Sequence, residues 1–299
     1  MREIFEKILG AENVFENEPM NLHTTFKIGG KADWFLTPKS REQLSSVLRA
    51  VKDLNLPFFI LGNGSNLLVG DKGIRGVVIC FCKSMDKIEV CGDEIYAESG
   101  AILSKVSSVA LGAELAGFEF ASGIPGSVGG AIFMNAGAYE HEMKEIVKYV
   151  DYMDMDGNIF RASETECDFG YRTSMFSKGE YIILGCCFKL KKDNKAEIKA
   201  RIDDYTKRRV SKQPLEKPSA GSTFKRPVGH FAGGLIEQAE LKGFSVGGAQ
   251  VSEKHAGFII NTGNATAKDV IDLIEYVKKT VFEKFGVMLE PEVKMIGEF

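Results

Sequence analysis

The chain has 299 residues, which is long enough for a large buried core and for two or three domains. Its hydrophobic fraction of 44% and charged fraction of 26% are typical of a soluble globular protein. The 38 basic and 41 acidic residues leave a net charge of −3, which gives no reason to expect nucleic acid or an anionic membrane as a partner. No apolar run approaches the length of a membrane span, and the first residues predict a helix rather than a signal peptide, so we expect a cytoplasmic protein.

The first 80 residues predict a small β-α-β unit. After the amino-terminal helix, residues 32–37 have the composition of a strand. Ser40 predicts a helix N-cap, and Gln43 three residues later completes the pattern of a capping box. We expect this helix to run to about Leu54 and a short buried strand to follow at residues 58–61.

Residues 76–190 predict a strand-rich region that one helix interrupts. Turn signals such as Asp156-Gly157 separate its apolar runs, and the helix is expected at residues 102–115. The strand candidates are residues 76–81, 86–90, 94–99, 147–154, 158–162 and 181–190.

Six cysteines mark this part of the chain, at positions 80, 82, 91, 167, 186 and 187. They form no CxxC pair, and no histidine is close enough in sequence to complete a zinc pattern. Most lie in apolar runs, where a reduced cysteine behaves as a small hydrophobic residue. We therefore expect buried reduced thiols and no metal site.

The last third of the chain combines helices and short strands. A charged helix is expected at residues 195–211 as a connector, followed by an element at residues 232–241. Apolar residues at helical spacing predict an amphipathic helix at residues 266–285, which Gly286 ends. Residues 287–296 predict a closing strand.

The glycine-rich segment 122–139, SGIPGSVGGAIFMNAGAY, predicts a binding loop. Five glycines fall within it, and backbone without Cβ atoms can turn sharply and bring its N–H groups against a ligand. Successive N–H donors of this kind suit phosphate oxygens. A glycine-rich surface turn is the simpler interpretation for an isolated cluster of this kind.

A second glycine loop, LGNGSNL, lies at residues 61–67. It lacks the third glycine of a Rossmann fingerprint, since Leu67 stands there, and no clear helix follows. The Walker A pattern is also missing. The two glycine loops together predict a two-part cradle that brackets a pyrophosphate.

Three further side chains are candidates for chemistry, and each also has a simpler structural interpretation. Arg172 offers paired donors for a carboxylate or an enolate oxygen, but a lone arginine is commonly a solvated surface residue. Ser222 can donate a proton only where the fold places it beside a developing carbanion, and it otherwise caps or turns. Glu292 shares one face of the predicted closing strand with Glu290 and Lys294, and that face either lines a cleft or meets solvent.

Seven blocks of sequence, in order, carry a family resemblance. They are residues 21–35, 61–69, 122–139, 171–176, 218–227, 232–261 and 289–297. Over nearly its whole length the chain resembles the UDP-N-acetylenolpyruvoylglucosamine reductase family, the flavoenzymes of bacterial peptidoglycan precursor synthesis.

The resemblance implies an α+β fold: a two-subdomain FAD-binding unit of the PCMH (vanillyl-alcohol-oxidase-like) type and a C-terminal α+β substrate-binding domain. The implied boundaries are 1–80 for the β-α-β subdomain, 81–206 for the strand-rich subdomain and 207–299 for the substrate-binding domain. FAD is expected to bind non-covalently between the two glycine loops. The implied cofactor-binding residues are Leu61, Gly62, Asn63, Gly64, Ser65, Asn66, Ser122, Gly123, Ile124, Pro125, Gly126, Ser127, Gly129, Gly130, Ala131, Asn135, Gly137 and Ala138.

The resemblance also implies the reaction. NADPH reduces the flavin, which delivers hydride to the enolpyruvyl group of UDP-N-acetylglucosamine enolpyruvate and gives UDP-N-acetylmuramate. By motif, Arg172 corresponds to the arginine that contacts the enolpyruvyl carboxylate, Ser222 to the proton donor and Glu292 to the carboxylate that assists at the same centre.

Further implied residues concern the nucleotide. Lys212 and Arg226 correspond to contacts with the UDP phosphates, and His255 to a polar residue of the cleft. The chain is short for the family and lacks an insertion that carries a substrate-capping tyrosine, so it resembles the smaller, type II form. We expect a monomer with small-molecule partners.

Two other functions stay open on the sequence. A FAD-dependent hydroxy-acid or sugar oxidoreductase on the same fold needs both glycine loops but not the blocks around Ser222 and Glu292. A non-catalytic nucleotide-binding protein needs none of Arg172, Ser222 and Glu292, so the presence of all three argues against it.

Overall fold

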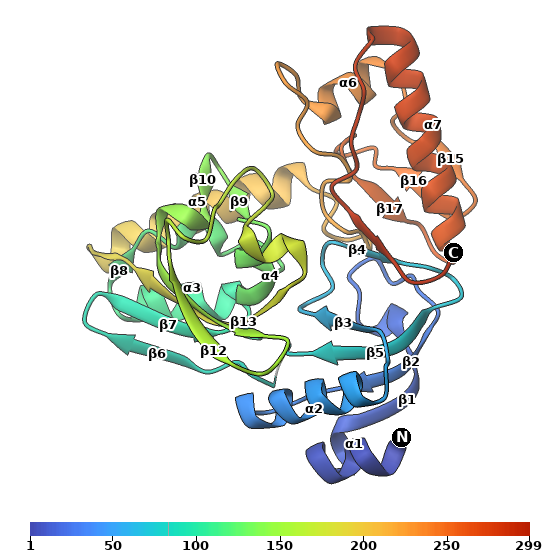
Figure 1. Cartoon of the computed structure of the whole chain (residues 1–299). Helices are drawn as coiled ribbons and strands as arrows, with labels where there is room; N and C mark the ends of the chain where they lie inside the picture. The colour runs from blue at the N-terminus through green and yellow to red at the C-terminus, as the bar shows by residue number, and fades with distance from the viewer. Residues whose placement is uncertain (83) are drawn as a thin grey trace. The chain divides into compact units, whose positions relative to one another are not determined.

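The computed structural model describes residues 1–82 and 84–299 and divides them into two compact units, each built from several chain segments (Figure 1). Unit 1 consists of Met1–Phe15, Trp34–Asn63 and Val77–Arg208. Unit 2 consists of Glu16–Asp33, Gly64–Gly76 and Arg209–Phe299. The three-part division at residues 80 and 206 stays a prediction.

The amino-terminal region forms the predicted helices and strands, together with β1, which was not predicted, around a four-stranded sheet of order β1-β2-β5-β3. Its elements are α1 (Arg2–Leu9), β1 (Val14–Pro19), β2 (Lys31–Leu36), α2 (Arg41–Asp53), β3 (Phe58–Leu61) and β5 (Ile74–Cys80). Strands β3 and β5 run parallel, with Leu61 opposite Cys80. In unit 1, Phe5 of α1 packs edge-on against Trp34, with ring centroids 5.5 Å apart.

Two details of this region differ from prediction. Ser40 caps α2 by accepting a hydrogen bond from Gln43 N, but the Gln43 side chain accepts from Lys39 N rather than from the N-cap amide. The capping box is therefore not reciprocal at Ser40, because Gln43 reaches one residue too far back. Strand β3 is mostly half-buried, and only Leu61 is fully buried.

The strand-rich region of unit 1 forms a five-stranded antiparallel sheet of order β12-β11-β13-β7-β6, as predicted in position. Its strands are β6 (Ile88–Cys91), β7 (Glu94–Glu98), β11 (Val147–Asp154), β12 (Ile159–Ser163) and β13 (Tyr181–Lys189). The helices are α3 (Leu103–Gly112), α4 (Val128–Phe133) and α5 (Lys195–Lys212). The shorter elements are β8 (Leu115–Ala116), β9 (Gly137–Ala138), β10 (His141–Glu142) and β14 (Lys191–Lys192). Its core includes Phe118 and Phe188, whose rings meet edge-on at 5.0 Å.

The cysteine prediction holds for Cys80, Cys167, Cys186 and Cys187, which are buried. It is wrong for Cys91, which is exposed because it ends β6 at the edge of the sheet, and Cys82 is only partly buried. Among the residues that the structure describes, no group of three or more potential ligands could hold a metal ion. In the same residues, no helix is both long enough and apolar enough to cross a membrane.

Unit 2 packs α7 (Ala267–Phe285) against a three-stranded sheet of order β15-β16-β17. The elements are β15 (Ser245–Val246), β16 (Ala249–Val251), β17 (Ile259–Asn261), α6 (Ala232–Gln238), β4 (Leu67–Val69) and β18 (Lys294–Ile296). Thr266 and Asp269 form a reciprocal capping box at the start of α7, and Gly286 ends the helix with φ 68°. The predicted helix is confirmed with its boundaries.

The predicted closing strand at residues 287–296 is wrong in length, because only β18 forms a continuous strand. Pro291 makes an isolated bridge with Phe224, and the amides of Lys225 and Glu292 bond across it to Glu290 and Thr223. From Lys294 onward the chain pairs instead with β4, in parallel. This change of partner interrupts the strand.

Candidate functional site

The two glycine-rich segments meet within unit 1. A Cβ atom on Gly62 would lie 2.5 Å from Ser127 Oγ, so any other residue here would require the Ser127 side chain to shift. Beside it, Asn63 Nδ2 donates a hydrogen bond to Pro125 O over 2.7 Å. Residues 62–63 and 125–127 therefore lie side by side, as the predicted two-part cradle requires.

The second segment is also fixed from its other side. Val128 N donates to Ala101 O over 2.8 Å, and Gly129 N donates to Ser99 O over 2.9 Å. A side chain on Gly129 would clash with Ser99 Oγ, which explains the glycine at this position. The glycine-rich segment is therefore not a continuous loop, since it contains the short helix α4 with Ser127 as its N-cap.

Several polar groups in this part of unit 1 are left for a ligand. Within the described residues, the backbone amides of Gly62, Asn63, Gly126 and Ser127 have no hydrogen-bond acceptor. Ser122 Oγ is buried and likewise has no partner among the described residues. Buried polar atoms are normally hydrogen-bonded, so these groups fit the phosphate oxygens of a dinucleotide.

Other predicted cofactor residues make hydrogen bonds or packing contacts within unit 1. Asn135 is fully buried with φ 44°; its amide nitrogen donates to Glu142 and Gly170 and its amide oxygen accepts from Lys144 N. This side chain is fully hydrogen-bonded within unit 1, and the contact of Asn135 with FAD stays a prediction. The remaining members contribute backbone or packing: Leu61 and Ala131 are buried, Ile124 packs on the core, Gly130 is exposed, and Gly137 and Ala138 form β9. The predicted FAD contact of Gly123 stays a prediction.

Gly64, Ser65 and Asn66 belong to unit 2. The carbonyl of Gly64 accepts from Thr25 N over 3.2 Å. Asn66 Nδ2 donates to Glu292 O over 3.2 Å, and Lys294 N donates to Asn66 O. The second half of the LGNGSNL loop is thus bonded to the segment that carries Glu292.

The backbone segments that carry Ser222 and Glu292 pair with each other in unit 2. Glu292 N donates to Thr223 O over 2.8 Å. Thr223 is itself buried and bonded to Gly257 O through its amide and to Ile259 N through its hydroxyl. The neighbouring Ser222 is exposed and Glu292 is half-buried, so both side chains lie on a rigid backbone with access to a ligand.

Arg172 lies in unit 1, at the second position of a tight turn. Gly170 and Thr173 exchange backbone hydrogen bonds across it, and Arg172 adopts the left-handed φ of 57°. Its guanidinium lies 5.0 Å from the centre of the Tyr171 ring. That Arg172 acts on the same substrate group as Ser222 and Glu292 stays a prediction.

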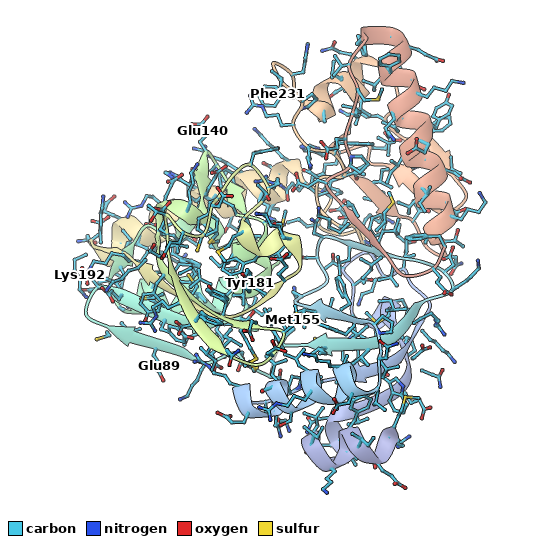
Figure 2. All side chains as sticks on the ribbon, viewed as in Figure 1. Glu89, Glu140, Met155, Tyr181, Lys192 and Phe231 are labelled. Carbon is cyan, nitrogen blue, oxygen red and sulfur yellow. The ribbon has the colours of Figure 1, made fainter. Side chains whose placement is uncertain are left out.

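The predicted nucleotide contacts all lie in unit 2. Lys212 and Arg226 are exposed. The Arg226 guanidinium lies 4.0 Å from the centre of the Phe231 ring, on the loop before α6 (Figure 2).

His255 is half-buried and accepts a hydrogen bond from Gly257 N at Nδ1 over 3.1 Å, which leaves the proton of the neutral ring on Nε2. Burial lowers the pKa of His255, and the cations of Lys242 and Lys212 lower it further. Both observations favour the neutral imidazole, which carries its proton on Nε2.

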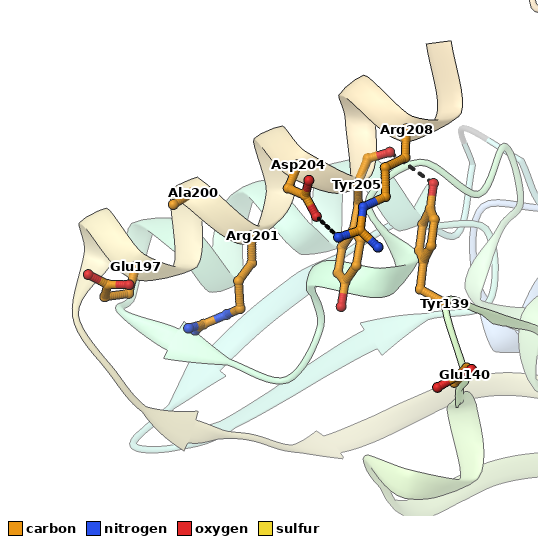
Figure 3. A pocket seen from close by; sticks show the side chains of 8 residues that line it. All are labelled: Tyr139, Glu140, Glu197, Ala200, Arg201, Asp204, Tyr205 and Arg208. Atoms are coloured by element: carbon orange, nitrogen blue, oxygen red, sulfur yellow. Dashed lines mark hydrogen bonds and ion pairs between the residues drawn. The ribbon is translucent and has the colours of Figure 1, made fainter. Parts of the chain in front are cut away.

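Unit 1 also has a pocket of about 610 Å³ that the sequence did not predict (Figure 3). It lies between α5 and the turn after β9, where the rings of Tyr139 and Tyr205 stack at 4.3 Å. The lining residues are Tyr139, Glu140, Glu197, Ala200, Arg201, Asp204, Tyr205 and Arg208. Tyr139 is the last residue of the predicted binding loop 122–139, and the other seven lie outside the predicted site. Arg201 and Arg208 are ion-paired with acidic neighbours.

Sequence reasoning missed the residues that hold the site in place. Ser99, Thr223 and Cys82 contact the predicted residues from distant positions, and Cys82 Sγ donates to Asn63 Oδ1 over 3.3 Å. The only sequence signal for Cys82 was its position just after an apolar strand that neighbours the glycine loop.

The comparisons with known proteins show which family this chain resembles. The model of the UDP-N-acetylenolpyruvoylglucosamine reductase C-terminal domain matches residues 213–296, and that of an FAD binding domain matches residues 32–163. UDP-N-acetylenolpyruvoylglucosamine reductase of Caldanaerobacter subterraneus subsp. tengcongensis is 54% identical over 98% of this chain and 97% of its own length. That of Clostridioides difficile is 53% identical over 97% of this chain and 96% of its own.

Solved structures give the same answer. The crystal structure of UDP-N-acetylenolpyruvylglucosamine reductase (MurB) from Thermus caldophilus matches with a TM-score of 0.81 and 36% identity, over 94% of this chain and 97% of that one. The 4-ethylphenol oxidase of Gulosibacter chungangensis shares the fold alone, with a TM-score of 0.51 and 16% identity over 97% of this chain and 64% of that one. The predicted α+β fold with an FAD-binding domain is confirmed. The chain therefore belongs to the UDP-N-acetylenolpyruvoylglucosamine reductase family.

Proposed function

We propose that this chain catalyses the NADPH-dependent reduction of the enolpyruvyl group of UDP-N-acetylglucosamine enolpyruvate, with FAD held non-covalently, to give UDP-N-acetylmuramate. The observation that carries the proposal is that the backbone segments of Ser222 and Glu292 are bonded together, since Glu292 N donates to Thr223 O over 2.8 Å. Both residues fall in the stretch that matches the reductase C-terminal domain. An oxidase on the same fold has no need of this pair.

The cradle of unit 1 holds the cofactor in this proposal. The amides of Gly62, Asn63, Gly126 and Ser127, which have no acceptor within the described residues, bind phosphate oxygens, and the buried Ser122 hydroxyl gives a further hydrogen bond. When bound, FAD supplies the transfer of hydride from NADPH to the substrate.

The protein supplies charge and protons. Arg172 binds the enolpyruvyl carboxylate and stabilises the negative charge that develops on it, because a guanidinium presents paired donors to two oxygens. Ser222 donates a proton to C2, and Glu292 assists at the same centre. The neutral His255, with Lys212 and Arg226, binds the UDP portion.

The assay combines purified protein, FAD, NADPH and UDP-N-acetylglucosamine enolpyruvate, and follows both NADPH absorbance and product mass. The expected result is NADPH loss that depends on both FAD and substrate, with a product that carries two more hydrogen atoms than the substrate. NADPH loss with FAD alone, without that product, would contradict the proposal.

Two further properties are part of the proposal. The protein works as a monomer in the cytoplasm, where NADPH and the nucleotide substrate are both dissolved. Light scattering during size-exclusion chromatography tests the first property, and a mass near 32.9 kDa is expected.

A further inference from the structure

A side-chain bridge joins the two segments of the cradle in unit 1. Asn63 Nδ2 donates to Pro125 O over 2.7 Å, and Asn63 Oδ1 accepts from Cys82 Sγ over 3.3 Å. We call these two hydrogen bonds the Asn63 bridge. We propose that Asn63 is a positioning residue that holds the cradle at the width of the FAD pyrophosphate and so sets how long FAD stays bound.

The chemistry of the three partners fixes the orientation of the amide. Pro125 O is a carbonyl oxygen and can only accept, so the nitrogen of Asn63 must face it. The oxygen of Asn63 is then left for the Cys82 thiol, which can donate. Neither aspartate nor alanine can make both bonds.

The bridge matters because the rest of the cradle contact is weak. Among the described residues, the two segments also meet at the close approach of Gly62 to Ser127. This is a steric contact, which keeps the segments from moving closer but does not hold them together. Residues 125–129 are anchored independently through Ser99 and Ala101. The turn at residues 62–63 is the part that needs a tether, and Cys80 Sγ also reaches Gly62 O at 3.9 Å.

Pre-positioning reduces the cost of binding. A ligand that finds its donors already in place does not have to order them, so the benefit falls mainly on the rate of dissociation. This inference rests on the proposed function, since it assumes that FAD occupies the cradle.

The experiment measures FAD dissociation in four variants of the full chain: Asn63→Ala, Asn63→Asp, Cys82→Ala and Cys82→Ser. Flavin fluorescence reports the equilibrium constant, and dilution into excess apoprotein reports the rate. Asn63→Ala removes both hydrogen bonds of the bridge and is expected to raise the FAD dissociation constant about three- to tenfold. Asn63→Asp is expected to raise it more than tenfold, because its carboxylate faces both a carbonyl and the phosphates.

The cysteine pair separates a tether from simple packing. Cys82→Ala removes the donor and is expected to weaken FAD binding about twofold, whereas Cys82→Ser keeps a donor and should restore binding to that of the wild type. The matched control is Asn158→Ala, an exposed asparagine of unit 1 that bonds Asp154 in a hairpin. It should leave FAD binding unchanged.

Three results decide the matter. The proposal stands if the Asn63 variants lose FAD faster while the thermal unfolding of their apoproteins matches the wild type. It is overturned if Asn63→Asp binds FAD like the wild type, or if the loss of affinity is matched by an equal loss of apoprotein stability. A wild-type protein that binds no FAD would instead refute the proposed function.

Discussion

Glu292 donates its backbone N–H to the carbonyl oxygen of Thr223 over 2.8 Å. This bond ties the residue after Ser222 to the carboxyl-terminal segment of the chain, some 70 residues later, and the Asn66 side chain bonds the carbonyl of the same Glu292. The two proposed catalytic side chains of unit 2 are thus set on one bonded frame. Their spacing does not depend on flexible loops.

Ser222→Ala is expected to separate the two half-reactions. FAD reduction by NADPH should keep its rate, because the serine hydroxyl has no proposed part in that step. Reoxidation by the enolpyruvyl substrate should slow by a factor of about 10² to 10⁴, the range for loss of a general acid. Anaerobic stopped-flow absorbance of the flavin measures both rates.

Ser245→Ala is the control for this variant. Ser245 is also an exposed serine of unit 2, and its hydroxyl donates to Gly243 O and accepts from Gln250 Nε2. It should change neither half-reaction. An equal loss in both half-reactions of Ser222→Ala would refute the role of proton donor.

Arg172→Gly is expected to slow the reaction with substrate without lowering the stability of the protein. The left-handed φ of 57° at Arg172 is strained for any residue with a Cβ, and glycine relieves about 1 kcal/mol of that strain. The free energy of unfolding should therefore be unchanged or higher. Substrate-dependent reoxidation should slow at least about a hundredfold, because the donors to the carboxylate are lost.

Urea unfolding and stopped-flow kinetics check the two parts of this prediction. Arg172→Lys keeps the charge but loses the paired donors, so its reoxidation rate should fall between those of the wild type and Arg172→Gly. If Arg172→Gly is reoxidised by substrate at the rate of the wild type, Arg172 has no part in the reaction.

Tyr96→Phe tests a buried polar network in unit 1. The Tyr96 hydroxyl accepts from Arg41 over 2.7 Å and donates to Asp151 over 3.2 Å, and burial raises its pKa, so it stays protonated. Its loss should lower the free energy of unfolding by about 1 to 3 kcal/mol, since Arg41 loses a buried partner.

Tyr276→Phe is the matched control, because Tyr276 is an exposed tyrosine that stacks on Phe244. It should stay within about 0.5 kcal/mol of the wild type in urea unfolding. A Tyr96→Phe protein as stable as this control would show that the network does not stabilise unit 1.

His255 is expected to make stability depend on pH. Burial holds its pKa below that of the unfolded chain, with Lys242 and Lys212 acting in the same direction and Glu237 and a backbone hydrogen bond opposing. The unfolded chain therefore binds more protons as the pH falls through the ordinary histidine range, and the folded state loses stability there. Above that range the penalty is absent.

His255→Asn isolates this effect. Its amide oxygen can replace Nδ1 as the acceptor for Gly257 N, but it does not titrate. As the pH falls from 8 to 5, the unfolding free energy of the wild type should decrease relative to that of His255→Asn. A constant difference across that range would contradict the assignment.

Much of the fold could be predicted because its signals are local. The period of apolar residues and the Thr266 cap define α7, and the strands of the large sheet follow from apolar runs between turns. The closing strand could not be predicted in length, because it changes partner from the segment of Thr223 to β4 at Val293. Only tertiary packing decides such a change.

Sequence motifs named the candidate site residues but not the residues that support them. Glycine content pointed to residues 61–66 and 122–139, yet the helix α4 inside the second segment was hidden by the same glycines. The Asn63 bridge spans 62 residues of sequence to Pro125, and no local pattern reports contacts of that range.

The most direct measurement is anaerobic reduction of the FAD-loaded protein by NADPH, followed by addition of UDP-N-acetylglucosamine enolpyruvate. The account predicts bleaching of the flavin absorbance by NADPH and its full return on addition of that substrate, with UDP-N-acetylmuramate formed in equal amount. A flavin that stays reduced until oxygen is admitted would contradict the account.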